Sequence, residues 1–268
     1  MTNANDLLRM MINASIAAGK AILTVYDMAD FGVKIKDDNS PLTLADLASS
    51  DVINSYLKKT GYPIISEEIK NQQFEARKDW ETCWIVDPLD GTKEFVKRNG
   101  EFTVNIALCA HGAPTLGVIY VPVTRELYYA NVKEEKAYKT VLDEHHSNPE
   151  NLFNEKDRIN PSMAQKKLLR VVGSRSHMNQ DTLDYIAKAE ESFDAIEIVS
   201  KGSSLKFCLV AEGKADVYPR FAPTMEWDTA AGHAICKAVG LKVTSQGTQE
   251  ELQYNKKNLL NPYFLVEK

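Results

Sequence analysis

The sequence predicts a protein of mixed structure, α+β in its first half and α/β in its second. Two observations lead to this prediction. Between residues 102 and 140, four runs rich in β-branched and aromatic residues are joined by short turns, which is typical of an antiparallel meander. From residue 168 onward, short apolar runs alternate with helical patterns, which is typical of α/β structure.

The first half begins with a predicted helix over residues 7–25, where apolar residues recur at steps of three and four. Residues 37–41 are expected to form a loop. Thr43 is the expected N-cap of a second helix that runs to about residue 58, with Asp46 in its first turn. Residues 63–65 form a short strand. A buried strand over residues 83–86 is expected to end at Asp87, because Pro88 has no N–H to continue a ladder.

The remaining elements follow from the same patterns. Residues 143–167 are polar and loop-like, and we place there a boundary between a domain of residues 1–150 and a domain of residues 151–268. Helices are expected over residues 180–190, 203–212 and 227–239, the last two closed by Gly213 and Gly240. Strands are expected over residues 102–110, 115–121, 126–130, 136–140, 168–172, 195–199, 215–218, 241–244 and 263–266.

The composition is that of an ordinary globular protein, with 44% hydrophobic and 26% charged residues in a chain of 268. The net charge of −5 argues against a nucleic-acid polymer as partner, but it allows a small anion held by local cations. The four cysteines are far apart in apolar contexts, so we expect buried, reduced thiols. With no basic leader and no run near ~20 apolar residues, the expected location is the cytoplasm.

The most informative stretch is Asp87-Pro-Leu-Asp-Gly-Thr92, which places two carboxylates and a hydroxyl directly after a buried strand. Burying carboxylates at such a place costs free energy unless a cation pairs with them. Several oxygen ligands within so short a stretch suit Mg²⁺. Further acids lie where the chain changes direction, at Asp46, Glu67-Glu68 and Asp228. Taken singly, each has a plainer explanation: a first-turn acid, a solvated turn and an N-cap.

Three of these motifs occur together and in order: Glu67-Glu68, Asp87 to Thr92, and Trp227-Asp-Thr-Ala-Ala-Gly232. In this the chain resembles the inositol monophosphatase superfamily, Mg²⁺-dependent and lithium-sensitive phosphomonoesterases. The resemblance covers nearly the whole chain. It implies a layered αβαβα sandwich of the inositol monophosphatase and sugar phosphatase type.

The segments that flank these motifs indicate which group within the superfamily the chain resembles. Residues 36–46, Gly91-Thr-Lys-Glu-Phe95, Asn99-Gly-Glu-Phe102 and Gly202-Ser-Ser-Leu-Lys206 are similar to those of the CysQ-type 3′(2′),5′-bisphosphate nucleotidases. The resemblance implies hydrolysis of adenosine 3′,5′-bisphosphate (PAP) to AMP and phosphate, activity on PAPS as a possibility, and a role in sulfur assimilation and PAP recycling. Members of that group can also associate peripherally with the inner membrane.

The resemblance also assigns roles to residues. One Mg²⁺ would be held by Glu67, Asp87 and the carbonyl of Leu89, and a second by Asp87, Asp90 and Asp228. Two such ions, sharing a carboxylate, suit in-line phosphoryl displacement. Thr92 would orient the attacking water, with Asp46 as proton acceptor. Substrate-binding roles fall on Glu67, Asp90, Gly91, Thr92, Lys93, His177, Ser203, Lys206, Arg220 and Asp228.

Two alternatives stay open at this point. An inositol or sugar phosphatase could be built on the same fold, and a metal- or nucleotide-binding module could lack catalysis. The Asp46 and Thr92 pair argues against the second, since pure binding needs no group that activates water. The sequence leaves the oligomeric state and the choice between PAP and PAPS undetermined.

Overall fold

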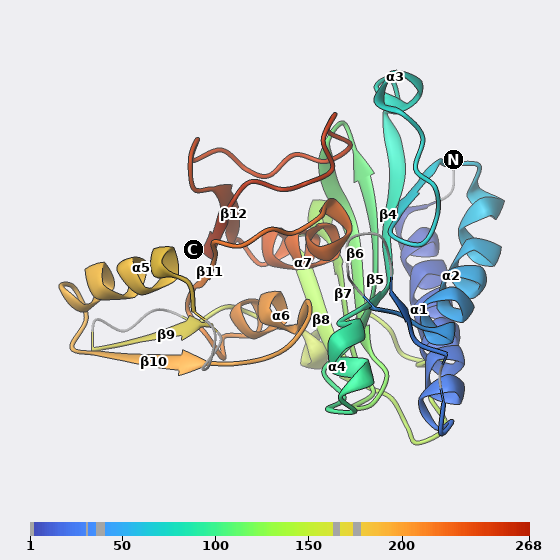
Figure 1. Ribbon diagram of the computed structural model, residues 1–268, viewed down its shortest axis with the longest axis horizontal. Coiled ribbons are helices and arrows are strands. Elements are labelled where there is room, and N and C mark those ends of the chain that lie inside the picture. Colours follow the sequence, from blue (N-terminus) through green and yellow to red (C-terminus); the bar gives the residue numbers. More distant parts are fainter. Residues whose placement is uncertain (1–2, 31, 36–40, 163–166, 174–177) are drawn as a thin grey trace.

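The computed structural model describes residues 3–30, 32–35, 41–162, 167–173 and 178–268 (Figure 1). The loop expected over residues 37–41 therefore lies outside the described residues, apart from Pro41. The longer helices are α1 (Ala4–Tyr26), α2 (Leu44–Leu57), α5 (Gln180–Glu190), α6 (Leu205–Ala211) and α7 (Glu226–Ala238). Short helices are α3 (Phe74–Arg77), α4 (Thr92–Val96) and the 3₁₀ turns Lys58–Thr60, Val132–Glu134 and Glu155–Asp157.

Among its described residues, the first half contributes eight strands, all but two of them in one sheet. They are β1 (Lys34–Ile35), β2 (Pro41–Leu42), β3 (Ile64–Ser66), β4 (Thr82–Asp90), β5 (Thr103–Ala110), β6 (Ala113–Val121), β7 (Glu126–Asn131) and β8 (Lys136–Val141). The large sheet has the order β3-β4-β5-β6-β7-β8. Strand β3 runs parallel to β4, and every other pairing is antiparallel. The predicted meander is confirmed.

The second half contributes β9 (Leu168–Val172), β10 (Ala195–Val199), β11 (Tyr218–Arg220), β12 (Lys242–Ser245) and β13 (Phe264–Glu267). Strands β9 and β10 form a parallel pair, and β11-β13-β12 form an antiparallel sheet. A bridge between Val171 and Val217 joins the two pieces. The predicted strand over residues 215–218 is shifted, because Val217 makes only this bridge and the regular pairing starts at Tyr218.

These elements stack in five layers (Figure 1). Helices α1 and α2 cover one face of the large sheet, and α7 covers the other with α6 packed against it. The smaller sheet follows, and α5 packs on β10 and β11. The αβαβα order predicted from the resemblance is confirmed. The predicted boundary near residue 150 falls between β8 and β9, and a division into two domains stays a prediction.

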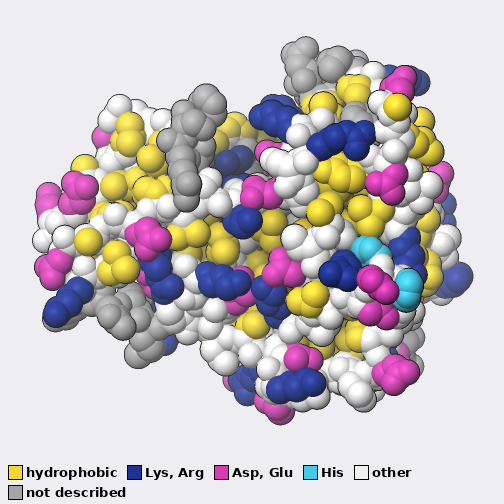
Figure 2. Space-filling model, turned by 90° about the horizontal axis from the view of Figure 1, so that it is seen from below, with side chains coloured by type: hydrophobic (Ala, Val, Ile, Leu, Met, Phe, Trp, Pro, Cys, Tyr) yellow, Lys and Arg dark blue, Asp and Glu magenta, His cyan; other side chains and the backbone are white. Residues whose placement is uncertain are grey.

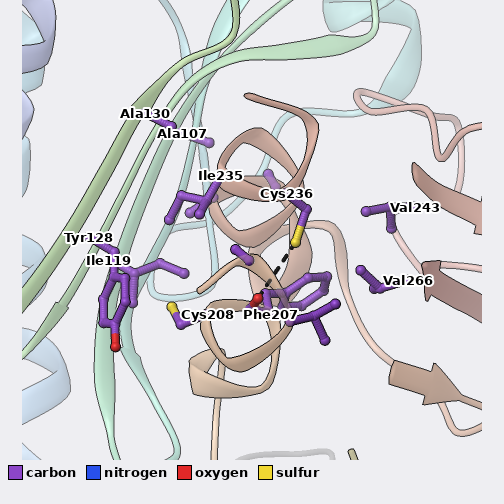
Figure 3. Close-up of a cluster of buried hydrophobic side chains, with 14 of the residues drawn as sticks. Ala107, Ile119, Tyr128, Ala130, Phe207, Cys208, Ile235, Cys236, Val243 and Val266 are labelled. Carbon is purple, nitrogen blue, oxygen red and sulfur yellow. Dashed lines mark hydrogen bonds between the residues drawn. The ribbon is translucent and has the colours of Figure 1, made fainter. Parts of the chain in front are cut away.

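The large sheet is buried on both faces, which is why its strands are almost continuous apolar runs. One hydrophobic cluster lies between the sheet and helices α1 and α2. A second lies between the sheet, α6, α7 and the smaller sheet, where Ile235 points toward Ile119 and the Phe207 ring lies on the side of Val266 (Figure 3). Cys83, Cys109, Cys208 and Cys236 are all buried and free, as expected.

Helix α1 meets the length and composition criteria for a membrane span, which corrects the expectation that no segment comes near them. It is the one such helix among the described residues. Its apolar residues, including Leu8, Ile12 and Ile16, are buried in the cluster against the sheet. This burial is what a core helix of a soluble protein shows.

Helix α7 approaches the sheet and α6 very closely, because glycines lie at both contacts. A Cβ atom on Gly117 of β6 would lie 2.6 Å from the carbonyl oxygen of Ala231. A Cβ atom on Gly232 would lie 2.4 Å from the ring of Phe207 in α6. No real Cβ atom tolerates such distances, so both positions require glycine for this packing. The helix that carries Asp228 is thereby fixed against the end of the sheet.

A buried histidine on the same helix gives a prediction about acid stability. The side chain of His233 is 1% exposed, and its Nδ1 lies 3.0 Å from the hydroxyl of Tyr254. Burial, followed by the charge of Lys237, lowers the pKa of His233 to about 3. Below about pH 6.5 the unfolded chain takes up a proton that the folded chain does not, so this group's contribution to stability is lost as the pH falls.

We therefore expect His233→Gln to lose less stability on acidification than the wild type does. Each pH unit should cost the wild type ~1.4 kcal/mol more than the variant. The two losses in free energy of unfolding should therefore differ by about 2 kcal/mol near pH 5. Urea unfolding in EDTA near pH 5 and near pH 7.5 measures it, with His145→Gln, at an exposed histidine, as the matched control. An equal loss of stability in wild type and His233→Gln would contradict the prediction.

Candidate active site

A β-bulge in β4 brings Asp87 and Asp90 to one face of the sheet. In a regular strand, residues three apart point to opposite faces. Here Asp87 is opposite Asn105 and Asp90 is opposite Thr103, with a register shift between them. Because opposed residues share a face, both aspartates lie on the face of Asn105 and Thr103.

The bulge also corrects the prediction that the strand ends at Asp87. Strand β4 continues through Pro88 to Asp90. Two residues of β4 face one of β5 at the bulge, so the ladder does not need an N–H from proline. The carbonyl of Pro88 accepts a hydrogen bond from the buried hydroxyl of Ser49 in α2, at 2.6 Å.

Glu67 and Asp228 reach the same region from other elements. Glu67 follows β3, which runs parallel to β4, and its backbone N–H donates to the carbonyl of Val86 at 3.4 Å. Asp228 lies in the first turn of α7, but it is not the N-cap that we predicted. Met225 is the capping residue, and its backbone N–H donates to Asp228 Oδ2 at 2.7 Å.

The charges of these acids act on one another. Burial raises the pKa of Asp87, which is 1% exposed, well above its ordinary value, and the charges of Glu67, Asp90, Asp228 and Asp46 raise it further. Burial also raises the pKa of Asp228 to about 7, with Asp90 as the largest charge contribution. Among the described residues, no group of three His, Cys, Asp or Glu side chains is already close enough to hold a metal ion.

Asp46 and Thr92 form the contact that the sequence analysis predicted. The Thr92 hydroxyl lies 3.1 Å from Asp46 Oδ1 and 3.4 Å from the Leu89 carbonyl oxygen. The other oxygen, Asp46 Oδ2, accepts from the backbone N–H of Thr43 at 2.7 Å and from its hydroxyl at 2.6 Å. Thr43 and Asp46 thus form the capping box of α2, which fixes the carboxylate.

A small cavity opens beside the acids. Its volume is about 60 Å³, and its lining includes the acids Asp90 and Asp228 together with Ser203, Lys206 and Arg220. A second cavity of about 130 Å³ shares Lys206, Tyr218 and Arg220 with it and extends along β9, α5 and β11. Through these shared residues the two cavities are neighbours, and acidic and basic side chains lie together at the smaller one.

Polar atoms in this space lack partners within the described part of the chain. Ser203 Oγ and Arg220 Nε are both buried without a hydrogen-bond partner there. Ser203 adopts a left-handed backbone conformation with φ of 42°, a conformation that non-glycine residues hold mainly where the surroundings require it. Burial lowers the pKa of Lys206, whose Nζ donates to the Ser203 carbonyl at 3.0 Å. An anion in the cavity would satisfy these groups.

The structure brings most of the predicted residues together, but not all of them. Gly91 forms the turn between β4 and α4 with φ of 95°. Lys93 is exposed on α4, and the described lining of neither cavity includes it. His177 lies outside the described residues.

Two functional candidates were missed from the sequence, Asn105 and Ser204. Both contact the Asp90 carboxylate, at 3.3 Å and 2.7 Å respectively. The one available signal was the alternation Thr103-Val-Asn105, which puts two polar side chains on one face of an otherwise apolar strand.

Comparisons with known proteins give relatives over nearly the full length. Residues 3–264 match the model of the inositol monophosphatase family. The 3′(2′),5′-bisphosphate nucleotidase CysQ of Salmonella typhimurium is 46% identical over 254 residues, which are 93% of this chain and 94% of that protein. The CysQ nucleotidase of Haemophilus influenzae is 32% identical over 269 residues, covering 99% of this chain and 94% of that protein.

Solved structures agree with this fold. The crystal structure of CysQ from Bacteroides thetaiotaomicron, described as a bacterial member of the inositol monophosphatase family, matches with a TM-score of 0.85 and 48% identity, covering 98% of this chain and 97% of that one. The inositol monophosphatase (IMPase) of Thermotoga maritima matches with a TM-score of 0.74 at 23% identity, over 98% of this chain and 92% of that one. This second likeness concerns the fold alone.

Proposed function

The chain belongs to the inositol monophosphatase family, and on that premise we propose that it is a Mg²⁺-dependent 3′(2′),5′-bisphosphate nucleotidase. It hydrolyses PAP to AMP and phosphate, with PAPS as a second candidate substrate. The relatives of 46% and 48% identity are named as CysQ, and the Salmonella protein as a nucleotidase of this specificity. A cytoplasmic location and a role in PAP recycling belong to the same proposal.

The observation that carries the proposal is a cavity lined by both acidic and basic side chains. A substrate with two phosphates can place one against Lys206 and Arg220 and the other toward Asp90 and Asp228. An inositol monophosphate has one phosphate and leaves the basic groups unpaired, which is costly for buried charges. The basic side chains of the cavity therefore favour the nucleotide over the inositol ester.

The acidic group fits Mg²⁺ by the chemistry of its donors. Glu67, Asp87, Asp90, Asp228 and the Leu89 carbonyl offer only oxygen atoms, which magnesium prefers. The four carboxylates carry about four negative charges in their ionised forms, which two Mg²⁺ ions would balance. When bound, Mg²⁺ would act as a Lewis acid at the phosphate and activate a water molecule.

The chain's own residues would orient the attacking water. Thr92 has a single hydroxyl proton and donates it to Asp46, at 3.1 Å. Its oxygen lone pairs are then available to accept a hydrogen bond from water. Asp46, held by two hydrogen bonds from Thr43, would take up the proton that the water loses.

Removal of the Thr92 hydroxyl should therefore lower turnover more than binding. We expect Thr92→Val to lower kcat for PAP by about 10²–10³-fold, a typical range for general acid–base and orienting groups, with KM little changed. Thr92→Ser keeps the hydroxyl and should retain most of the activity. Steady-state phosphate release measures both variants, and equal losses in the two would count against the orienting role.

A substrate panel tests the function as a whole. Phosphate release is measured from PAP, PAPS, adenosine 3′-monophosphate and inositol 1-phosphate, each with Mg²⁺ and with EDTA. We expect the highest kcat/KM for PAP, and no release in EDTA. A clear preference for inositol 1-phosphate would overturn the proposal in favour of an inositol phosphatase. Tight PAP binding without turnover would show a binding module.

The charge distribution supports a small-molecule substrate. On the face shown in Figure 2, Lys and Arg side chains alternate with Asp and Glu side chains, and no broad basic surface covers it. With the net charge of −5, this agrees with the expectation that a nucleic-acid polymer is not the partner.

A further inference from the structure

A buried chain of hydrogen bonds ends on the Asp90 carboxylate. Thr103 and Asn105 of β5 and Ser204, the residue before α6, are 0%, 1% and 2% exposed. The Thr103 hydroxyl donates to Asn105 Oδ1 at 2.9 Å. Asn105 Nδ2 donates to Ser204 Oγ at 2.8 Å and lies 3.3 Å from Asp90 Oδ2. Ser204 Oγ lies 2.7 Å from the same Asp90 oxygen.

The number of protons that each group can donate fixes the direction of this series of hydrogen bonds. Thr103 supplies its only proton to the carbonyl end of the Asn105 amide, so the NH₂ end must face Ser204 and Asp90. One amide proton goes to Ser204 and the other toward Asp90. Ser204 then directs its own single proton to the Asp90 carboxylate, the stronger acceptor, although the Asp228 carbonyl is also near, at 3.0 Å.

The two donors meet at one oxygen of Asp90. Both contacts are to Oδ2, and within the described residues no hydrogen bond reaches Oδ1. The carboxylate is therefore held by one oxygen, and the other is left for a ligand. The same hydroxyl touches the α7 backbone at Asp228, and Ser204 directly follows Ser203 of the cavity lining.

We propose that Asn105 and Ser204 are positioning residues that orient Asp90 for a divalent cation; this inference rests on the proposed function. They are not ligands themselves, because both are buried against Asp90 and the described lining of the cavity includes Asp90 but neither of them. Partners of this kind restrict the rotation of a ligating carboxylate, and losing one typically costs 10–100-fold in metal affinity. A purely structural role would instead lower thermal stability and leave the affinity of the folded protein for Mg²⁺ unchanged.

The test measures Mg²⁺ binding without substrate, by isothermal titration calorimetry on the full chain. We expect Ser204→Ala and Asn105→Ala to weaken Mg²⁺ binding by about 10–100-fold at a temperature where both are folded. Ser15→Ala is the matched control, because Ser15 is also a fully buried serine with one hydrogen bond, to the Ile12 carbonyl in α1. Its Mg²⁺ affinity should stay within about twofold of the wild type.

A milder variant keeps the test decisive if Asn105→Ala does not fold. Ser204→Cys keeps a side chain of similar shape but replaces the hydroxyl by a weak donor, and it should bind Mg²⁺ less tightly than wild type. Dissociation constants within about twofold of wild type for both Ser204→Ala and Ser204→Cys would overturn the inference. PAP hydrolysis by the wild type is measured separately. Its absence would reject the proposed function, whereas the calorimetric comparison judges the positioning role.

Discussion

Asp87→Asn is expected to abolish Mg²⁺-dependent release of phosphate from PAP while the chain still folds. Asp87 lies at the centre of the acidic group, since the charges of Glu67, Asp90, Asp228 and Asp46 all act on it. In the proposed site it is also the one carboxylate shared by both cations. The loss in kcat/KM should reach about 10³-fold or more, because removing even one pre-organised electrostatic group costs about 10²–10³-fold.

Folding should survive this substitution because asparagine has nearly the same shape and removes a buried charge. Its Oδ1 can still accept the hydrogen bond from the Leu89 backbone N–H, which is 3.0 Å long in the native protein. Thermal unfolding in EDTA should show a midpoint no lower than that of the wild type. The matched control is Asp51→Asn on the exposed side of α2, which should keep wild-type activity. Activity near the wild-type level in Asp87→Asn would contradict the bridging role.

Lys206→Met is expected to raise KM for PAP by about 30–150-fold, the loss that corresponds to about 2–3 kcal/mol for a charged hydrogen bond. Lys206 is half-buried, and loss of solvation, followed by the charge of Arg220 among the lowering effects, lowers its pKa. A bound phosphate would provide the charge partner that this lysine needs. Methionine keeps the length and apolar stem of the side chain and removes the charge and the N–H donors, including the one to the Ser203 carbonyl.

The comparison substrate makes this prediction specific. Adenosine 3′-monophosphate has the scissile phosphate but no 5′-phosphate, so its KM should change by less than about threefold in Lys206→Met. The control Lys242→Met replaces an exposed lysine on β12 and should leave both substrates unaffected. Equal increases in KM for the two substrates would remove Lys206 from the second-phosphate site.

Local signals were enough to predict most elements of the fold. The bounds of α5 were predicted correctly because Asn179 caps its first turn and the apolar spacing continues to Glu190. The capping box of Thr43 and Asp46 likewise fixed the start of α2. In both cases the signal lies within a few residues of the element that it defines, so no knowledge of tertiary contacts is needed.

The misplaced end of β4 and the missed pair of Asn105 and Ser204 come from contacts between distant segments, whereas the error at Asp228 is local. Strand β4 passes through Pro88 because β5 accommodates a bulge and Ser49, 39 residues away, binds the proline carbonyl. Asn105 and Ser204 meet across 99 residues of sequence, so no local pattern could indicate their contact. Asp228 resembles an N-cap by residue type, but its carboxylate reaches back to the N–H of Met225 from the third position of the helix.

A crystal structure with Mn²⁺ in place of Mg²⁺, together with AMP and phosphate, tests the central claim most directly. Anomalous scattering locates the manganese ions without reference to the protein. We predict peaks within about 2.0–2.3 Å of carboxylate oxygens of Glu67, Asp87, Asp90 and Asp228, with Asp87 contacting two ions. Ions bound elsewhere, or a product complex in which these four side chains stay separate and metal-free, would contradict the account.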